Sequence, residues 1–110
     1  MTDTIAAIAT PPGNGGVSIV RISGENAEDI LQKVFRPAGK NVLPLTSHLL
    51  TYGYVTDGEE RVDECMAVLM RAPRSYTREN VAELQLHGGS YHVNKVLQLC
   101  LKAGARLADP

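Results

Sequence analysis

Arg21 is a charged residue inside an apolar run, and a residue of this kind needs a partner. It lies in the segment VSIVRIS at 17–23, in which apolar side chains occupy both faces of an expected strand. A buried cation without a partner destabilises a protein strongly, and arginine binds carboxylates through two parallel N–H donors. The sequence therefore predicts a carboxylate beside Arg21, supplied by the protein as an ion pair or by a ligand.

Glu83 is the second charged residue whose setting suggests chemistry. It lies in the segment VAELQLH at 81–87, which alternates between apolar and polar residues as a half-buried strand does. The apolar face carries Ala82 and two leucines, and the polar face carries Glu83, Gln85 and His87. A polar strand face of this kind is a candidate wall of a ligand site.

The same strand runs directly into Gly88, Gly89 and Ser90, ahead of an expected helix. Glycines before a helix N-terminus expose backbone N–H groups, and these favour anions. The composition fits two interpretations equally. One is a ligand site at the end of the strand, and the other is an ordinary solvated sheet face with Ser90 as the helix N-cap.

The glycine-rich segment PPGNGG at 11–16 invites a comparison with phosphate-binding loops, and it fails that comparison. A nucleotide P-loop needs a lysine and a hydroxyl residue after its last glycine, and here valine and serine follow. A dinucleotide-binding loop opens a helix, whereas this segment leads into the strand at 17–23. We expect a tight turn between two strands, with direct contact of its backbone to a ligand as the alternative.

Other chemical signals are weaker. His87 is a candidate general base, but no nucleophile stands beside it, so we expect no catalysis by this chain alone. Asp63 and Glu64 form an isolated acidic pair, which is weak ground for a metal site, and we expect none. Cys65 and Cys100 lie far apart in apolar patterns and are expected to be free and buried.

The elements that position these residues follow from hydrophobic periodicity. We expect strands at 4–10, 17–23 and 81–87, two further strands on either side of a turn at 57–61, and helices at 24–37 and 91–104. In the first helix, the apolar stripe is Ala27, Ile30, Leu31, Val34 and Phe35; in the second, Gly104 marks the end. The order β-β-α-β-β-β-α predicts an α+β fold, a mixed or antiparallel sheet with two helices packed on it.

Composition limits the function classes. The 110 residues suffice for one domain with a hydrophobic core, and a net charge of −1 argues against nucleic-acid binding by bulk electrostatics. The N-terminus lacks the basic region and long apolar run of a signal peptide or membrane helix, so we expect a cytoplasmic protein. The last residues, ARLADP, begin a further element, which indicates a fragment of a longer chain.

Three blocks of the sequence resemble one known family. DTIAAIATPPGNGGVSIVRISG, MRAPRSYTRENVAELQLHGG and GARLADP are similar to the N-terminal domain of the MnmE (TrmE) family of bacterial tRNA-modification GTPases. The resemblance covers nearly the whole chain, so it implies that residues 1–110 are this family's folate-binding and dimerisation domain. In the family, a stretch resembling GEFTxRAFLNGK follows GARLADP, and a helical domain and an inserted G domain come later.

The resemblance implies a function for the full-length protein. With its FAD-dependent partner MnmG (GidA), it modifies carbon 5 of the wobble uridine of certain tRNAs, using GTP hydrolysis with Mg²⁺ and K⁺. The N-terminal domain forms a homodimer and binds 5-formyltetrahydrofolate or a related tetrahydrofolate. Its fold is similar to the folate-binding domain of the glycine-cleavage aminomethyltransferase.

The resemblance also assigns site residues. The folate contacts of the family correspond to Arg21 and Glu83, and a third contact, a lysine, is expected after Pro110, as is the family's candidate catalytic cysteine. The weaker pocket candidates, assigned by position alone, are Arg74, Tyr76, His87, Gly88 and Gly89. A carboxylate such as Glu83 can accept the adjacent N–H donors of a pterin ring. The carboxylates of the folate tail suit Arg21 or the glycine segment; Glu83 is the other candidate partner of Arg21.

Two alternatives to this function stay open on the sequence. One is a purely structural dimerisation module with a vestigial folate pocket. The other is a free-standing aminomethyltransferase related to the glycine-cleavage protein, for which 110 residues are too few.

Overall fold

The computed structural model describes residues 3–9, 17–40, 43–72, 79–87 and 90–108. These residues form a sheet and two helices on one core. In chain order the elements are β1 (Ile5–Ile8), β2 (Val17–Ser23), α1 (Ala27–Val34), β3 (Phe35–Pro37), β4 (Thr51–Asp57), β5 (Glu60–Met70), β6 (Val81–His87), α2 (Ser90–Lys102) and β7 (Arg106–Leu107). The α+β class expected from the sequence is therefore confirmed.

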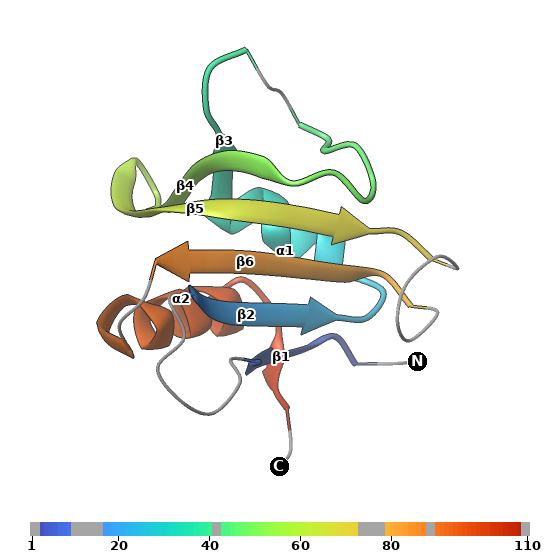
Figure 1. The fold of residues 1–110 in the computed structure, drawn as a ribbon. Coiled ribbons are helices and arrows are strands. Elements are labelled where there is room, and N and C mark those ends of the chain that lie inside the picture. Colours follow the sequence, from blue (N-terminus) through green and yellow to red (C-terminus); the bar gives the residue numbers. More distant parts are fainter. Residues whose placement is uncertain (1–2, 10–16, 41–42, 73–78, 88–89, 109–110) are drawn as a thin grey trace.

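The sheet has seven strands in the order β3-β4-β5-β6-β2-β1-β7. Neighbouring strands are antiparallel, except that β7 runs parallel to β1. Figure 1 shows both helices behind the sheet, on one of its faces, and the other face turned toward the viewer without a helix over it. We call this second face the open face, because no helix of the described residues covers it. The strands β2 and β6, which carry Arg21 and Glu83, lie side by side within the sheet.

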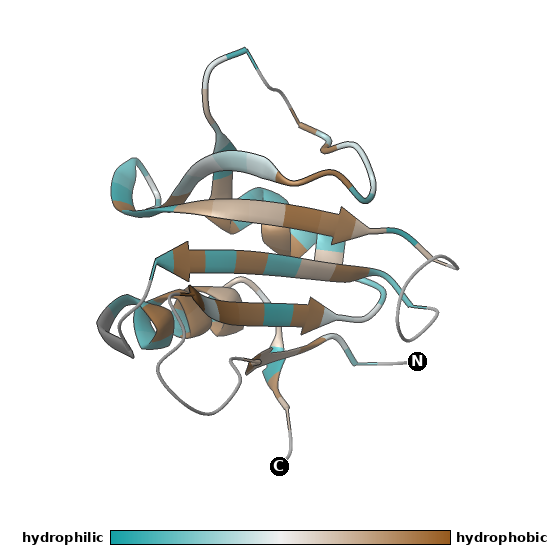
Figure 2. Ribbon diagram, viewed as in Figure 1, coloured by the Kyte–Doolittle hydropathy of each residue, from teal (hydrophilic) through white to brown (hydrophobic). Residues whose placement is uncertain are grey.

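The core lies between the sheet and the two helices. Alternate residues of β2, β5 and β6 point into it, and Figure 2 shows the resulting alternation of hydrophobic and hydrophilic residues along the central strands. The helices contribute the stripes that their periodicity predicts, and the core side chains include Val20, Ile22, Ile30, Leu31, Leu69, Leu84, Leu86 and Val96. Because the helices fill one face only, the odd-numbered residues of β2 and β6 are left for the open face.

The first helix is shorter than the sequence predicts, and the assignment of Phe35 to its apolar stripe was wrong. The helix ends at Val34, and Phe35 adopts an extended conformation (φ −127°, ψ 138°) that begins β3. Pro37 disfavours a helical conformation at Arg36, which ends the helix early. The ring of Phe35 is still buried, because it packs against Gly53 of β4, where no Cβ stands in its way.

Two short strands were not expected from the sequence. The three-residue β3 pairs with β4 at one edge of the sheet, and the two-residue β7 pairs with β1 at the other. The strand β7 is held by main-chain N–H groups of Arg106 and Ala108, which donate to the carbonyls of Thr4 and Ala6. Elements of two or three residues show no hydrophobic period, so pattern analysis cannot detect them.

The β4–β5 hairpin confirms the predicted turn and adds an irregularity. Asp57 pairs with Glu60, and Gly58 takes the positive φ of 63° that the turn between them requires. The register shifts by one residue between Val55 and Thr56. This bulge brings Thr56 opposite Arg61 and buries it next to Val55, so two successive residues are buried where the strand would otherwise alternate.

Both cysteines are free and buried, as predicted. Burial raises the pKa of each thiol to about 12, so both are protonated at mildly alkaline pH. We expect neither Cys65 nor Cys100 to react with a disulfide reagent in the folded chain, and both to react in denaturant. A time course of thiol labelling with and without urea measures this difference. Rapid labelling of either thiol without urea would contradict the packing described above.

Candidate functional site

Arg21 and Glu83 are brought together by the register of the two strands that carry them. Residues 17–23 of β2 pair with residues 81–87 of β6, and Arg21 lies directly opposite Glu83. Both side chains are on the open face because the alternate residues fill the core. The Nε and Nη2 atoms of Arg21 each lie 2.7 Å from Oε2 of Glu83. The partner that the sequence required for Arg21 is therefore Glu83.

The pair is asymmetric in its exposure. The side chain of Arg21 is 42% exposed, whereas that of Glu83 is 9% exposed. The two nitrogens of Arg21 that reach Glu83 both donate to the same oxygen, Oε2, and within the described part of the chain no donor lies on Oε1. An ionised carboxylate accepts through both oxygens. Glu83 therefore presents a nearly buried acceptor atom that is held in place by Arg21 and suited to an N–H or O–H donor of a ligand.

The surroundings of Glu83 on the open face follow from the same register. Across β2, β6 and β5, one row consists of Arg21, Glu83 and Val68. The next row, two residues further along the strands, consists of Ile19, Gln85 and Met66. Glu83 thus lies between Arg21 and the apolar Val68, and the next residue on this face of β6, Gln85, lies between Ile19 and Met66.

His87 lies on the same face of β6, as predicted, but it is not beside Glu83. The two residues are four positions apart, which corresponds to about 13 Å along a strand. The imidazole is 73% exposed, and its Nε2 lies 3.5 Å from Oε1 of Glu64 on β5. The structure therefore places His87 at the far end of the open face, in a separate group of polar residues.

The other weaker candidates, Arg74, Tyr76, Gly88 and Gly89, lie outside the described residues, and so does the side chain of Ser90. The glycine-rich turn at 11–16 lies outside them as well. The roles that the sequence suggested for these residues remain predictions.

Sequence reasoning missed a hydrogen-bonded group around Glu64. The hydroxyl of Tyr52 donates to Oε2 of Glu64 at 2.7 Å, and this bond to a carboxylate raises the pKa of the phenol above its ordinary value. His87 approaches the same carboxylate, so side chains from β4, β5 and β6 meet at Glu64 on the open face. No signal in the sequence indicated Tyr52, because its contact with Glu64 depends on the pairing of β4 with β5.

The acidic pair Asp63 and Glu64 does not form one site. Successive residues of a strand point to opposite faces, so the two carboxylates separate. Oδ2 of Asp63 lies 3.1 Å from Nδ1 of His92 in the first turns of α2, whereas Glu64 faces the open side. Among the described residues, no group of three or more His, Cys, Asp or Glu side chains is placed to hold a metal ion.

Comparison with known families identifies the chain. A family model described as "GTP-binding protein TrmE N-terminus" matches residues 4–110, a range that includes β2, β6 and the whole open face. The chain belongs to the TrmE N-terminal family. The resemblance read from the three sequence blocks is therefore confirmed.

Curated relatives of this family member carry the name "tRNA modification GTPase MnmE". Those from Synechococcus elongatus, Symbiobacterium thermophilum and Lactiplantibacillus plantarum are 56%, 53% and 49% identical to it. In each case the match covers 98% of this chain, but only 23–24% of the relative. The chain thus spans about a quarter of the length of these GTPases.

Neither α1 nor α2, the two helices among the described residues, has the length and hydrophobicity that a membrane-spanning helix needs.

Proposed function

We propose that residues 1–110 form the N-terminal tetrahydrofolate-binding and dimerisation domain of a tRNA-modification GTPase. The full-length protein, acting with MnmG (GidA), modifies carbon 5 of the wobble uridine of tRNA, and its GTP, Mg²⁺ and K⁺ are bound by another domain. Membership of the TrmE N-terminal family supports the assignment to this enzyme. The observation that carries the folate site is the Glu83 carboxylate, nine-tenths buried, with Oε1 left as an acceptor.

The chemistry of a reduced folate fits this carboxylate. A pterin ring has adjacent N–H donors on one edge, and Oε1 of Glu83 is the acceptor left for that edge because Arg21 occupies Oε2. Arg21 donates to Oε2 and holds the carboxylate in its orientation, so its main role is to position Glu83. The apolar neighbours Val68, Ile19 and Met66 offer surface for the ring faces beside the carboxylate.

The arrangement also agrees with the proposed likeness to the folate-binding domain of the glycine-cleavage aminomethyltransferase. An open sheet face with a glutamate near its centre offers room for an extended ligand, whose tail then runs along the strands or beyond their ends. In this binding mode the tail carboxylates avoid Glu64, which would repel them, and the lysine expected after Pro110 is the third contact.

A calorimetric titration with 5-formyltetrahydrofolate tests the proposal. It is performed on the 110-residue chain and on the chain with the residues after Pro110 restored, because the expected lysine lies there. We expect saturable binding to the longer chain and weaker binding to the shorter one. Absence of binding to the longer chain would overturn the folate assignment while leaving the family membership intact.

A second function is favoured by one feature of the site. Arg21 and Glu83 neutralise each other without a ligand, so the domain can be a structural dimerisation module whose folate pocket is vestigial. Light scattering tests dimerisation separately from folate binding. We expect the longer chain to be a dimer at micromolar concentration. Dimerisation without folate binding supports the structural module, and a strict monomer contradicts both functions as stated.

A further inference from the structure

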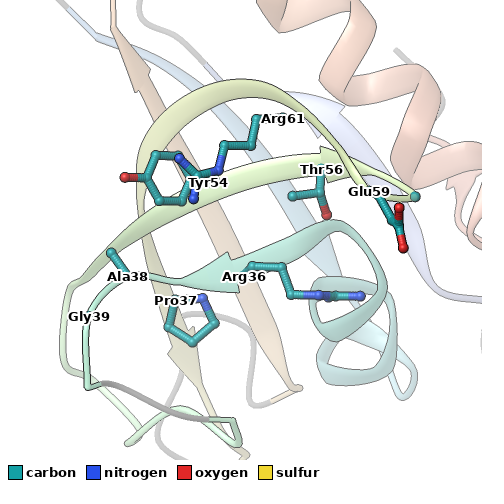
Figure 3. Close-up of a pocket in the computed structure, with 9 residues that line it drawn as sticks. Arg36, Pro37, Ala38, Gly39, Tyr54, Thr56, Glu59 and Arg61 are labelled. Atoms are coloured by element: carbon teal, nitrogen blue, oxygen red, sulfur yellow. The ribbon is translucent and has the colours of Figure 1, made fainter.

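A second candidate site lies on the other side of β5 from the Arg21–Glu83 pair. A pocket of about 510 Å³ is bounded by β3, the end of β4 and the β4–β5 turn. This volume is within the range of small-molecule sites in proteins. Figure 3 shows the side chains that line it, among them Arg36, Tyr54, Thr56, Glu59 and Arg61.

The two arginines of this pocket differ from the other arginines that the structure describes. The others each form an ion pair with a carboxylate at 2.7–2.8 Å: Arg21 with Glu83, Arg71 with Glu28 and Arg106 with Asp3. Within the described residues, Arg36 and Arg61 have no carboxylate within ion-pair distance, although Glu59 lines the same pocket. Two positive charges thus share one pocket with a single negative charge.

Both guanidinium groups are held in place by contacts that leave N–H donors for a ligand. Nη1 of Arg36 donates to the carbonyls of Gln32 at 2.7 Å and Phe35 at 3.0 Å, at the end of α1. These bonds fix the group and use only one of its three nitrogens. The guanidinium carbon of Arg61 lies 3.9 Å from the centroid of the Tyr54 ring, a cation–π contact that uses no N–H donor.

Strand register joins these residues into one group. Arg36 of β3 is directly opposite Tyr54 of β4, and Thr56 of β4 is directly opposite Arg61 of β5. Thr56 is 7% exposed, and its Oγ1 is a buried side-chain atom without a hydrogen-bond partner among the described residues. Such an orphaned hydroxyl is destabilising, so a ligand that bonds to it gains an interaction the protein alone lacks.

We propose that this pocket binds the phosphate group of a small phosphorylated ligand. One arginine is enough to satisfy a carboxylate through a two-pronged contact, whereas two guanidinium groups and a hydroxyl from three strands match the several oxygens of a phosphate. Glu59 at the rim repels the anion but offers an acceptor to hydroxyl groups in the remainder of the ligand. The site is independent of the proposed folate site.

Titration with inorganic phosphate at constant ionic strength, followed by NMR of the backbone amides, tests this proposal. We expect saturable shifts at Arg36, Ala38, Gly39 and residues 56–61, and affinity reduced by about 10-fold to 100-fold in Arg61→Gln, the usual effect of losing a hydrogen bond to a charged group. Arg61→Lys should recover part of the affinity. The matched control is Arg106→Gln at the opposite edge of the sheet, which should bind phosphate as the native chain does.

Further probes identify the chemical class. Acetate should bind more weakly than phosphate, and ribose 5-phosphate should bind at least as tightly as phosphate. The Thr56→Val variant should bind both phosphate and ribose 5-phosphate more weakly than the native chain does. Phosphate affinity unchanged in both Arg61→Gln and Thr56→Val would overturn the site. Equal affinity for acetate would overturn the phosphate assignment, and tighter binding of a short RNA than of ribose 5-phosphate would overturn the small ligand in favour of a nucleic-acid backbone.

Discussion

Replacement of Glu83 by glutamine is expected to weaken 5-formyltetrahydrofolate binding by about 10-fold to 100-fold, which is the effect of losing a hydrogen bond to a charged group. Glutamine keeps the size of the side chain but removes the charge that accepts the pterin donors. It also leaves Arg21 without its anionic partner. Calorimetric titration of the native chain and the variant, each continued past Pro110, measures the difference.

The control for this variant is Glu25→Gln, which removes a carboxylate from an exposed position ahead of α1. It changes the net charge by the same amount and should leave folate affinity as it is. A thermal melt verifies that Glu83→Gln is folded at the temperature of the titration. If the two variants bind folate equally well, Glu83 is not a ligand of the pterin, and the site lies elsewhere.

The second large effect concerns the packing that ends α1 and begins β3. Replacement of Gly53 by alanine is expected to lower the free energy of unfolding by about 3 kcal/mol, the upper end of overpacking effects. A Cβ at this position would overlap the carbonyl oxygen of Arg36 and would lie 2.6 Å from the nearest ring atom of Phe35. A main-chain atom of a paired strand and a buried ring cannot move aside easily.

Urea unfolding measures this change, and Gly58→Ala is the matched control. Gly58 has no atom within 4 Å of an added Cβ, so only its positive φ of 63° opposes the substitution. That conformation costs an alanine about 1 kcal/mol. If the two variants lost the same stability, the close approach of Phe35 to Gly53 would not be a determinant of the fold.

Much of the sheet could be predicted from the sequence because its strands are long enough to show a period. The alternation of residues 81–87 correctly predicted which face of β6 carries Glu83, and the apolar run at 17–23 predicted the need of Arg21 for a carboxylate. That Glu83 meets this need could not be decided from the sequence. The two residues are 62 positions apart, and only the register between β2 and β6 brings them together.

The features that the sequence did not predict depend on contacts between distant segments. The burial of Phe35 in β3 depends on the space that Gly53 leaves for its ring, although the spacing of Phe35 alone fits the helix. The pocket beside Thr56 depends on a one-residue register shift between β4 and β5, which leaves no pattern in a sequence rich in polar residues. The group of Tyr52, Glu64 and His87 also could not be predicted, because each residue comes from a different strand and only the pairing of the strands brings them together.

In the proposed site, the Oε1 atom of Glu83 accepts a hydrogen bond from a ring N–H donor of a reduced pterin. A crystal structure of the chain, continued past Pro110 and bound to 5-formyltetrahydrofolate, tests it most directly. We expect the pterin ring on the open face of the sheet, with a ring N–H donor within hydrogen-bond distance of Oε1 and Arg21 still bound to Oε2. A pterin ring bound away from Glu83, or a folate tail in its place, would contradict the proposed site.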